Sequence, residues 1–159
     1  MKKIFPFVLF SVILFTLNSY AQEFPIFEMR NKIFQESKEI VSMIDKTKNP
    51  VLITSMWDTC TIVITQIDAY FSMLGVFNSV KKEDQNKKSV DYLLNWLNEM
   101  QRTNQLNIKS LNSVRVPLDA MERVRIQRLT DIFLKLSKVI EEELTKLNLI
   151  KRSLKAGSR

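Results

Sequence analysis

The chain has 159 residues, with 24 lysines and arginines against 17 aspartates and glutamates, one cysteine and no histidine. The absence of histidine excludes histidine-ligated haem and zinc sites, the Glu-x-x-His di-iron site of helix bundles and every catalytic triad built on imidazole. The single cysteine, Cys60, excludes a disulfide framework within the chain, and we expect it to be a small buried hydrophobic residue.

The first 21 residues have the pattern of a secretory signal peptide. A pair of lysines precedes an apolar stretch over 4–17, and small residues lead up to Ala21, which predicts cleavage before Gln22. We therefore expect an exported chain of residues 22–159, periplasmic or secreted. An uncleaved anchor is the alternative, although the apolar stretch is short for a membrane span.

Cleavage would remove both of those lysines and leave 22 basic residues against 17 acidic ones, a net charge of +5. A charge of this size favours anionic partners such as lipid headgroups or acidic proteins. It is too small to indicate nucleic acid binding.

Residues 25–47 show the first helical pattern. Ile26, Ile33 and Ile40 are seven residues apart and share one face with further apolar side chains, as in an amphipathic helix. Pro25 stands where this helix would begin, a position that suits proline because the first helical N–H groups have no partner within the helix.

Residues 51–77 are apolar enough to suggest a membrane span. Apolar side chains recur at seven-residue spacing, and three in a row at 62–64 break the alternation that a strand would need. A span needs roughly 18 uncharged residues, and Asp68 near a bilayer centre would cost about 2.5–3.5 kcal/mol. We predict instead an amphipathic helix that begins near Pro50 and is buried by other helices. A polar stripe lies opposite its apolar face: Thr54, Asp58, Thr61, Thr65, Asp68 and Ser72.

Two further helical patterns follow a charged linker at residues 81–88. Apolar residues at alternating three- and four-residue steps mark residues 89–115 and 118–155. Asn104 and Asn107 interrupt the first of these stripes. They predict either a buried contact that sets the helix register or a weak helix end.

The last helix has the spacing of a capping box at Asp119 and Glu122. At its predicted length it would reach about 57 Å, so we expect it to bend or to project a basic tip. Short turns near 47–50 and 115–118 would make neighbouring helices antiparallel. The sequence thus predicts an all-α fold, an antiparallel up-and-down bundle of about four amphipathic helices in one domain, with a long C-terminal helix.

Four residues of the polar stripe are candidates for binding a partner. Asp58, Thr61, Thr65 and Asp68 are short side chains that would let another helix approach closely. A solvated helix face is the alternative interpretation. The two aspartates are not expected to act as an acid/base pair, because ten residues of helix separate them by about 15 Å.

Arg123, Arg125 and Arg128 are a second candidate partner-binding group. They crowd the start of the last helix, where positive charge opposes the helix dipole. Such a cost indicates a use, for example contact with an acidic partner. Solvated arginines are the alternative.

The segment from Met121 to Asp131, MERVRIQRLTD, leads into the long last helix of an exported helical chain. In this layout the chain resembles periplasmic pilus-associated components of conjugative type IV secretion systems. The likeness covers the layout and the last 40 residues. It implies a structural role in assembling envelope machinery, without catalysis.

From these observations we expect a non-enzymatic protein that binds other proteins of the cell envelope. No pattern indicates a catalytic residue, a cofactor or a metal site. The alternative is a basic periplasmic holdase or envelope-stress binding protein. An enzyme using only carboxylates, lysine or tyrosine, and a carrier of a small ligand in the bundle core, are further alternatives.

Overall fold

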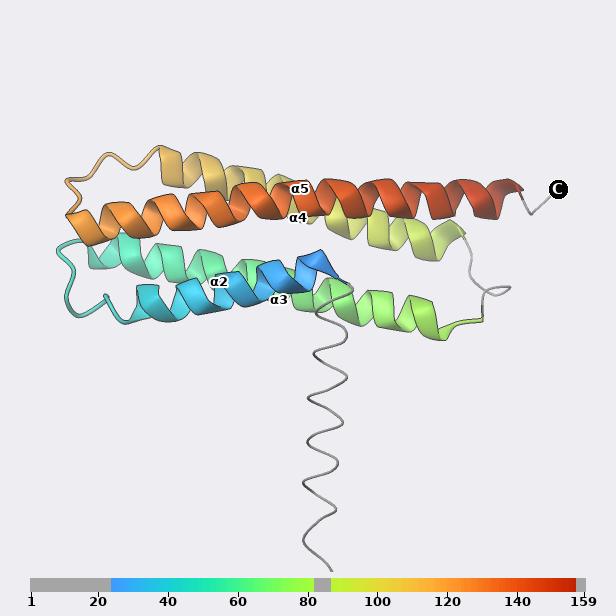
Figure 1. Ribbon diagram of the computed structural model, residues 1–159, viewed down its shortest axis with the longest axis horizontal. Coiled ribbons are helices and arrows are strands. Elements are labelled where there is room, and N and C mark those ends of the chain that lie inside the picture. The colour runs from blue at the N-terminus through green and yellow to red at the C-terminus, as the bar shows by residue number, and fades with distance from the viewer. Residues whose placement is uncertain (1–23, 82–86, 157–159) are drawn as a thin grey trace, which may run out of the picture.

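A computed structural model of the chain describes residues 24–81 and 87–156. These residues form four helices, labelled in Figure 1: α2 (Pro25–Val41), α3 (Pro50–Ser79), α4 (Lys87–Asn112) and α5 (Ala120–Ala156). No strand occurs among them, so the predicted all-α fold with a long C-terminal helix is confirmed. The predicted signal peptide, residues 1–21, lies outside the described residues.

The helices form an up-and-down bundle in which each contacts its sequence neighbours and α2 also contacts α5. The first two helices therefore pack as a hairpin and do not run on past Pro50. With 17 residues α2 is the shortest. In Figure 1 it accompanies α3 and α5 over about half of the bundle, and the other half is built by α3, α4 and α5.

The core is formed by the residues that the seven-residue spacing selected. Ile53, Cys60 and Ile67 of α3 are fully buried, and so are Tyr70 of the same helix and Phe133 of α5. Burying a side chain of this size contributes about 1.5–3 kcal/mol, so these contacts dominate the stability of the bundle. The expectation that the cysteine is a buried hydrophobic residue is confirmed.

The helix starts follow the prolines, while the end of α2 differs from the prediction. Proline occupies the first turn of both α2 and α3. The helix predicted over 25–47 ends at Val41. Hydrogen-bonded turns follow it, and in one of them the amide of Thr47 donates to the carbonyl of Met43 at 3.0 Å. These turns reverse the chain while Met43 stays buried.

The capping box at the start of α5 is confirmed. The amide of Glu122 donates to Asp119 Oδ1 at 2.8 Å, and the amide of Asp119 donates to Glu122 Oε2 at 2.9 Å. The Glu122 carboxylate also accepts hydrogen bonds from the hydroxyl of Thr47 and from Asn49 Nδ2, the latter at 2.9 Å. One buried carboxylate therefore joins the α2–α3 connection to the start of α5.

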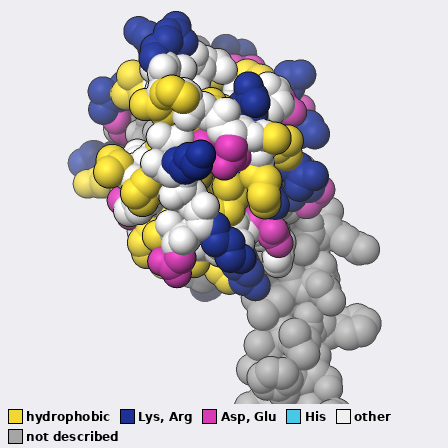
Figure 2. Space-filling model, turned by 90° about the vertical axis from the view of Figure 1, so that its left-hand side faces the viewer, with side chains coloured by type: hydrophobic (Ala, Val, Ile, Leu, Met, Phe, Trp, Pro, Cys, Tyr) yellow, Lys and Arg dark blue, Asp and Glu magenta, His cyan; other side chains and the backbone are white. Residues whose placement is uncertain are grey.

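Figure 2 views this end of the bundle, where basic, acidic and hydrophobic side chains are mixed.

Asn104 is buried between α4 and α5, which decides between the two interpretations of this position. Its side-chain nitrogen donates to the carbonyl of Phe133 at 2.7 Å and to the hydroxyl of Ser137 at 2.8 Å. Because a buried amide is costly away from its partners, this pair of bonds favours one register of α4 against α5.

The C-terminal part of α5 stays packed against the bundle. Leu147 is buried, and Lys151 forms an ion pair with Asp91 at the start of α4. The C-terminal end of α5 therefore lies at the same end of the bundle as the α3–α4 connection (Figure 1).

Candidate partner-binding surface

The outward side of α3 combines short polar side chains with a few exposed apolar ones. Of the described helices, α3 is the one long and apolar enough to cross a membrane, and 33% of its most apolar stretch is buried inside the bundle. Its core face packs against neighbouring helices, which leaves other apolar side chains outside. Ile62, for example, is 53% exposed. Ile62 is therefore the apolar side chain that this part of the surface offers to a partner.

Beside Ile62, the polar stripe of α3 carries hydroxyls that bond to their own helix. Thr61 Oγ1 donates to the carbonyl of Trp57 at 3.1 Å, and Thr65 Oγ1 donates to the carbonyl of Thr61 at 2.9 Å. Since these donors are already used one turn back, the two threonines offer their methyl groups to a partner at little desolvation cost. We call Asp58, Thr61, Ile62 and Thr65 the α3 outer face.

The two aspartates of the predicted site are placed differently. Asp68 accepts two hydrogen bonds from the guanidinium of Arg30 on α2, at 2.7 and 3.0 Å. The hydrogen bonds with Asp68 raise the pKa of Arg30. Asp58 is exposed and forms no ion pair with the described side chains. The structure therefore leaves Asp58 available to a partner and uses Asp68 to join α2 to α3.

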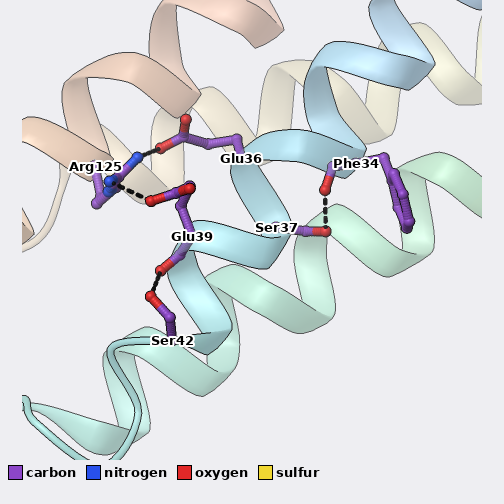
Figure 3. A network of polar contacts seen from close by, with 6 residues as sticks. All are labelled: Phe34, Glu36, Ser37, Glu39, Ser42 and Arg125. Carbon is purple, nitrogen blue, oxygen red and sulfur yellow. Dashed lines mark hydrogen bonds and ion pairs between the residues drawn. The ribbon is translucent and has the colours of Figure 1, made fainter.

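Of the three candidate arginines, Arg125 is engaged within the bundle (Figure 3). Its guanidinium donates to Glu36 at 3.0 Å and to Glu39 at 2.9 Å, both on α2. The side chains of Arg125 and Glu36 are 13% and 8% exposed. Arg123 and Arg128 are exposed at the surface of α5. The structure does not bring these arginines together with the α3 outer face into one site.

A groove between the end of α3 and the start of α4 was not predicted from the sequence. It has a volume of about 420 Å³ and an apolar lining. We call it the α3–α4 groove, and its main lining residues are Met73, Val76, Phe77, Val80, Tyr92 and Leu93. The sequence signal was the surplus of apolar residues on α3 beyond those of the core series. That surplus did not predict which α4 residues line the other side of the groove, because this depends on how α4 packs against α3.

Beyond the residues that line the α3–α4 groove, side-chain hydrogen bonds join α3 to α4. Trp96 Nε1 donates to the carbonyl of Gln66 at 2.9 Å, and Gln66 contacts Thr103 on the next turns of α4. From this point towards the α3–α4 connection, Val76 and Tyr92 are 67% and 74% exposed. The groove is thus open to solvent along its outer side.

Within the described ranges, no three acidic or cysteine side chains are placed to hold a metal ion. Comparison of the chain with protein-family models, with curated proteins and with solved structures found no match. The resemblance to pilus-associated components of type IV secretion systems therefore stays a prediction.

Proposed function

We propose that this protein acts without catalysis, by binding a helical segment of another protein of the cell envelope along the α3 outer face. The observation that supports the proposal is that α3, the most apolar helix of the bundle, has one side in water, where Ile62 is 53% exposed among short polar side chains. Because the solvated face of a bundle helix ordinarily carries polar side chains, an exposed isoleucine among them is a candidate contact residue.

The side chains of the α3 outer face suit a helical partner. Asp58, Thr61, Ile62 and Thr65 follow the three- and four-residue steps that align side chains on one side of a helix. Their short length permits close approach, and Ile62 supplies an apolar contact. The exposed carboxylate of Asp58 would pair with a basic residue of the partner, which fixes the direction of docking.

The envelope is the expected compartment because the N-terminal 21 residues have the pattern of a signal peptide. An assembly component of conjugation or secretion machinery would fit this mode of action. In that role Arg123 and Arg128 form a second, basic contact at the start of α5, since both are exposed.

Affinity capture from gently cross-linked envelopes, with the tag at the C-terminus, tests the proposal. We expect the wild-type chain to recover one or two envelope proteins and Ile62→Asp to recover them at least roughly tenfold less well, because the charge would be desolvated at the contact. Leu134→Asp is the matched control, since Leu134 is 47% exposed on α5. Equal recovery by both variants, or an empty result from a stable monomer, would refute the proposal.

The second candidate is a holdase, which the open apolar α3–α4 groove favours. A holdase would capture many unrelated unfolded proteins and suppress their aggregation in solution, whereas an assembly component would not. An aggregation assay with two unrelated client proteins separates the two functions.

A further inference from the structure

The net charge of the bundle is concentrated at one end. The described residues of this end, residue 81 with residues 87–91 and 147–156, contain six lysines and arginines and one acid. The other described residues contain fourteen basic and thirteen acidic residues, so they are nearly neutral as a whole. The end of α3, the start of α4 and the end of α5 lie together at this end of the molecule (Figure 1). We call it the basic end.

Most of the described cations at the basic end have no acidic partner among the described residues. Lys151 pairs with Asp91, at 2.5 Å. No ion pair of the described residues involves Lys81, Lys87 or Lys88, and all three are exposed. The opposite end, drawn in Figure 2, mixes both signs of charge.

The same end carries the α3–α4 groove. Lys81 directly follows Val80, the lining residue just after α3, and Lys87 and Lys88 directly precede Ser89, the first lining residue of α4. Val76 is 67% exposed and Tyr92 is 74% exposed. Both therefore lie close along the chain to three exposed lysines. A surface that is apolar in its centre and basic at its edge matches a lipid leaflet, which offers anionic headgroups outside and hydrocarbon beneath.

We propose that the basic end docks on an anionic lipid surface. Val76 and the ring of Tyr92 would enter the boundary between headgroups and acyl chains, where tyrosine is favoured because its ring is apolar and its hydroxyl polar. The lysines would extend their charges to the lipid phosphates while their apolar stems stay in contact with the groove. Each lysine held near such a surface raises the partition constant roughly fivefold.

A lipid surface fits this end better than an acidic protein does. The groove lining is almost wholly apolar, and the charge is confined to the segments at its edge. An acidic protein would need an apolar ridge that fits the shape of the groove. A lipid leaflet offers negative charge and an apolar layer at every position on its surface. This inference does not rest on the proposed protein binding, because the α3 outer face uses other residues.

Co-sedimentation with vesicles tests the proposal, on the full chain and on residues 22–159, which contain all four helices. The vesicles are pure phosphatidylcholine or phosphatidylcholine mixed with phosphatidylglycerol. We expect binding to the anionic vesicles alone, weakening as salt rises from 50 to about 300 mM because the charges are screened. The double variant Lys87→Gln, Lys88→Gln is expected to bind roughly 25-fold more weakly.

The matched controls lie at the opposite end of the bundle. Arg123→Gln with Arg128→Gln removes the same charge, and Val51→Ser matches Val76→Ser, since Val51 is also exposed on α3. These controls should bind as the wild type does, and Val76→Ser should lose affinity. Circular dichroism checks that every variant is folded. Absence of vesicle binding at low salt, equal binding to both lipids, or equal losses at both ends would overturn the proposal. Binding of an acidic protein without any vesicle binding would assign the basic end to a protein partner.

Discussion

The guanidinium of Arg125 on α5 donates a 3.0 Å hydrogen bond to the carboxylate of Glu36 on α2, across 89 residues of sequence. This pair lies on the contact between α2 and α5, the contact that closes the ring of four helices. Both side chains are largely withdrawn from water, so the Glu36 charge depends on Arg125 for compensation, whereas Arg125 also pairs with Glu39.

Replacing Arg125 by methionine should lower the free energy of unfolding by about 2–3 kcal/mol, because Glu36 would be left as an unpaired buried charge. Urea titration followed by circular dichroism measures the change. Arg102→Met is the control, since the Arg102–Glu99 pair is exposed and its loss should cost less than about 0.5 kcal/mol. Similar losses of unfolding free energy in both variants would contradict the conclusion that Arg125 compensates a buried charge.

Glu122 should make stability depend on pH. The hydrogen bond from Thr47, together with those from the Asp119 amide and Asn49, lowers the pKa of Glu122 below its ordinary value of 4.5. A carboxyl with a lower pKa in the folded state stabilises the fold above its unfolded pKa, and this contribution disappears as the pH falls through the folded pKa. Glu122 therefore stabilises the bundle at neutral pH and ceases to do so in acid.

Glu122→Gln should accordingly lose about 1–3 kcal/mol at pH 7, because the glutamine nitrogen would face the same donors. The difference from wild type should shrink below pH 4.5. Urea unfolding at a series of pH values from 7 to 3 measures it, with the exposed Glu99→Gln as control. A difference that is constant with pH would show that the ionised form is not the stabilising one.

Cys60 should be inert in the folded protein. Its side chain is fully buried, and burial, followed by the charge of Glu36, raises the pKa of the thiol to about 12. Because the thiolate is the reactive form, we expect an aromatic disulfide reagent at pH 8 to react at least roughly 100-fold more slowly than in urea. Ser110→Cys in a Cys60→Ser background supplies an exposed thiol for comparison. Rapid labelling of native Cys60 would show that the core opens.

Gly75 should be replaceable by alanine with a gain in stability. It lies inside α3, and a Cβ added there would meet no atom within 4 Å. Because glycine costs about 0.5–1 kcal/mol relative to alanine in a helix, Gly75→Ala should raise the free energy of unfolding by that amount. The reverse change in the same helix, Ala69→Gly, should lower it. Thermal and urea unfolding of both variants test the expected gain and the expected loss of stability.

The sequence predicted the helical parts of this fold well because their periods are strict. The core series through Ile53, Cys60 and Ile67 recurs every seven residues, and such a repeat places side chains on one helix face whatever the neighbours are. The prolines and the Asp119–Glu122 capping box act within one helical turn, so their effect is also local.

The candidate sites were predicted less completely. Asp58, Thr61 and Thr65 lie exposed, as a stripe opposite the core should. Asp68 and Arg125, in contrast, form ion pairs with α2, from which 38 and 89 residues of chain separate them. Nothing in the local pattern distinguishes a charged side chain that reaches another helix from one that remains in water.

Hydrophobic spacing and capping act over a few turns, so the sequence alone predicted the four helices, their antiparallel order and most of the core residues. The packing of the helices was needed to show that Asn104 is buried, that Glu122 joins the α2–α3 connection to the start of α5, and that an apolar groove opens beside the lysines of the basic end. Each of these features depends on the distance between side chains on different helices. That distance is set by the packing of the whole core, and no single segment carries it.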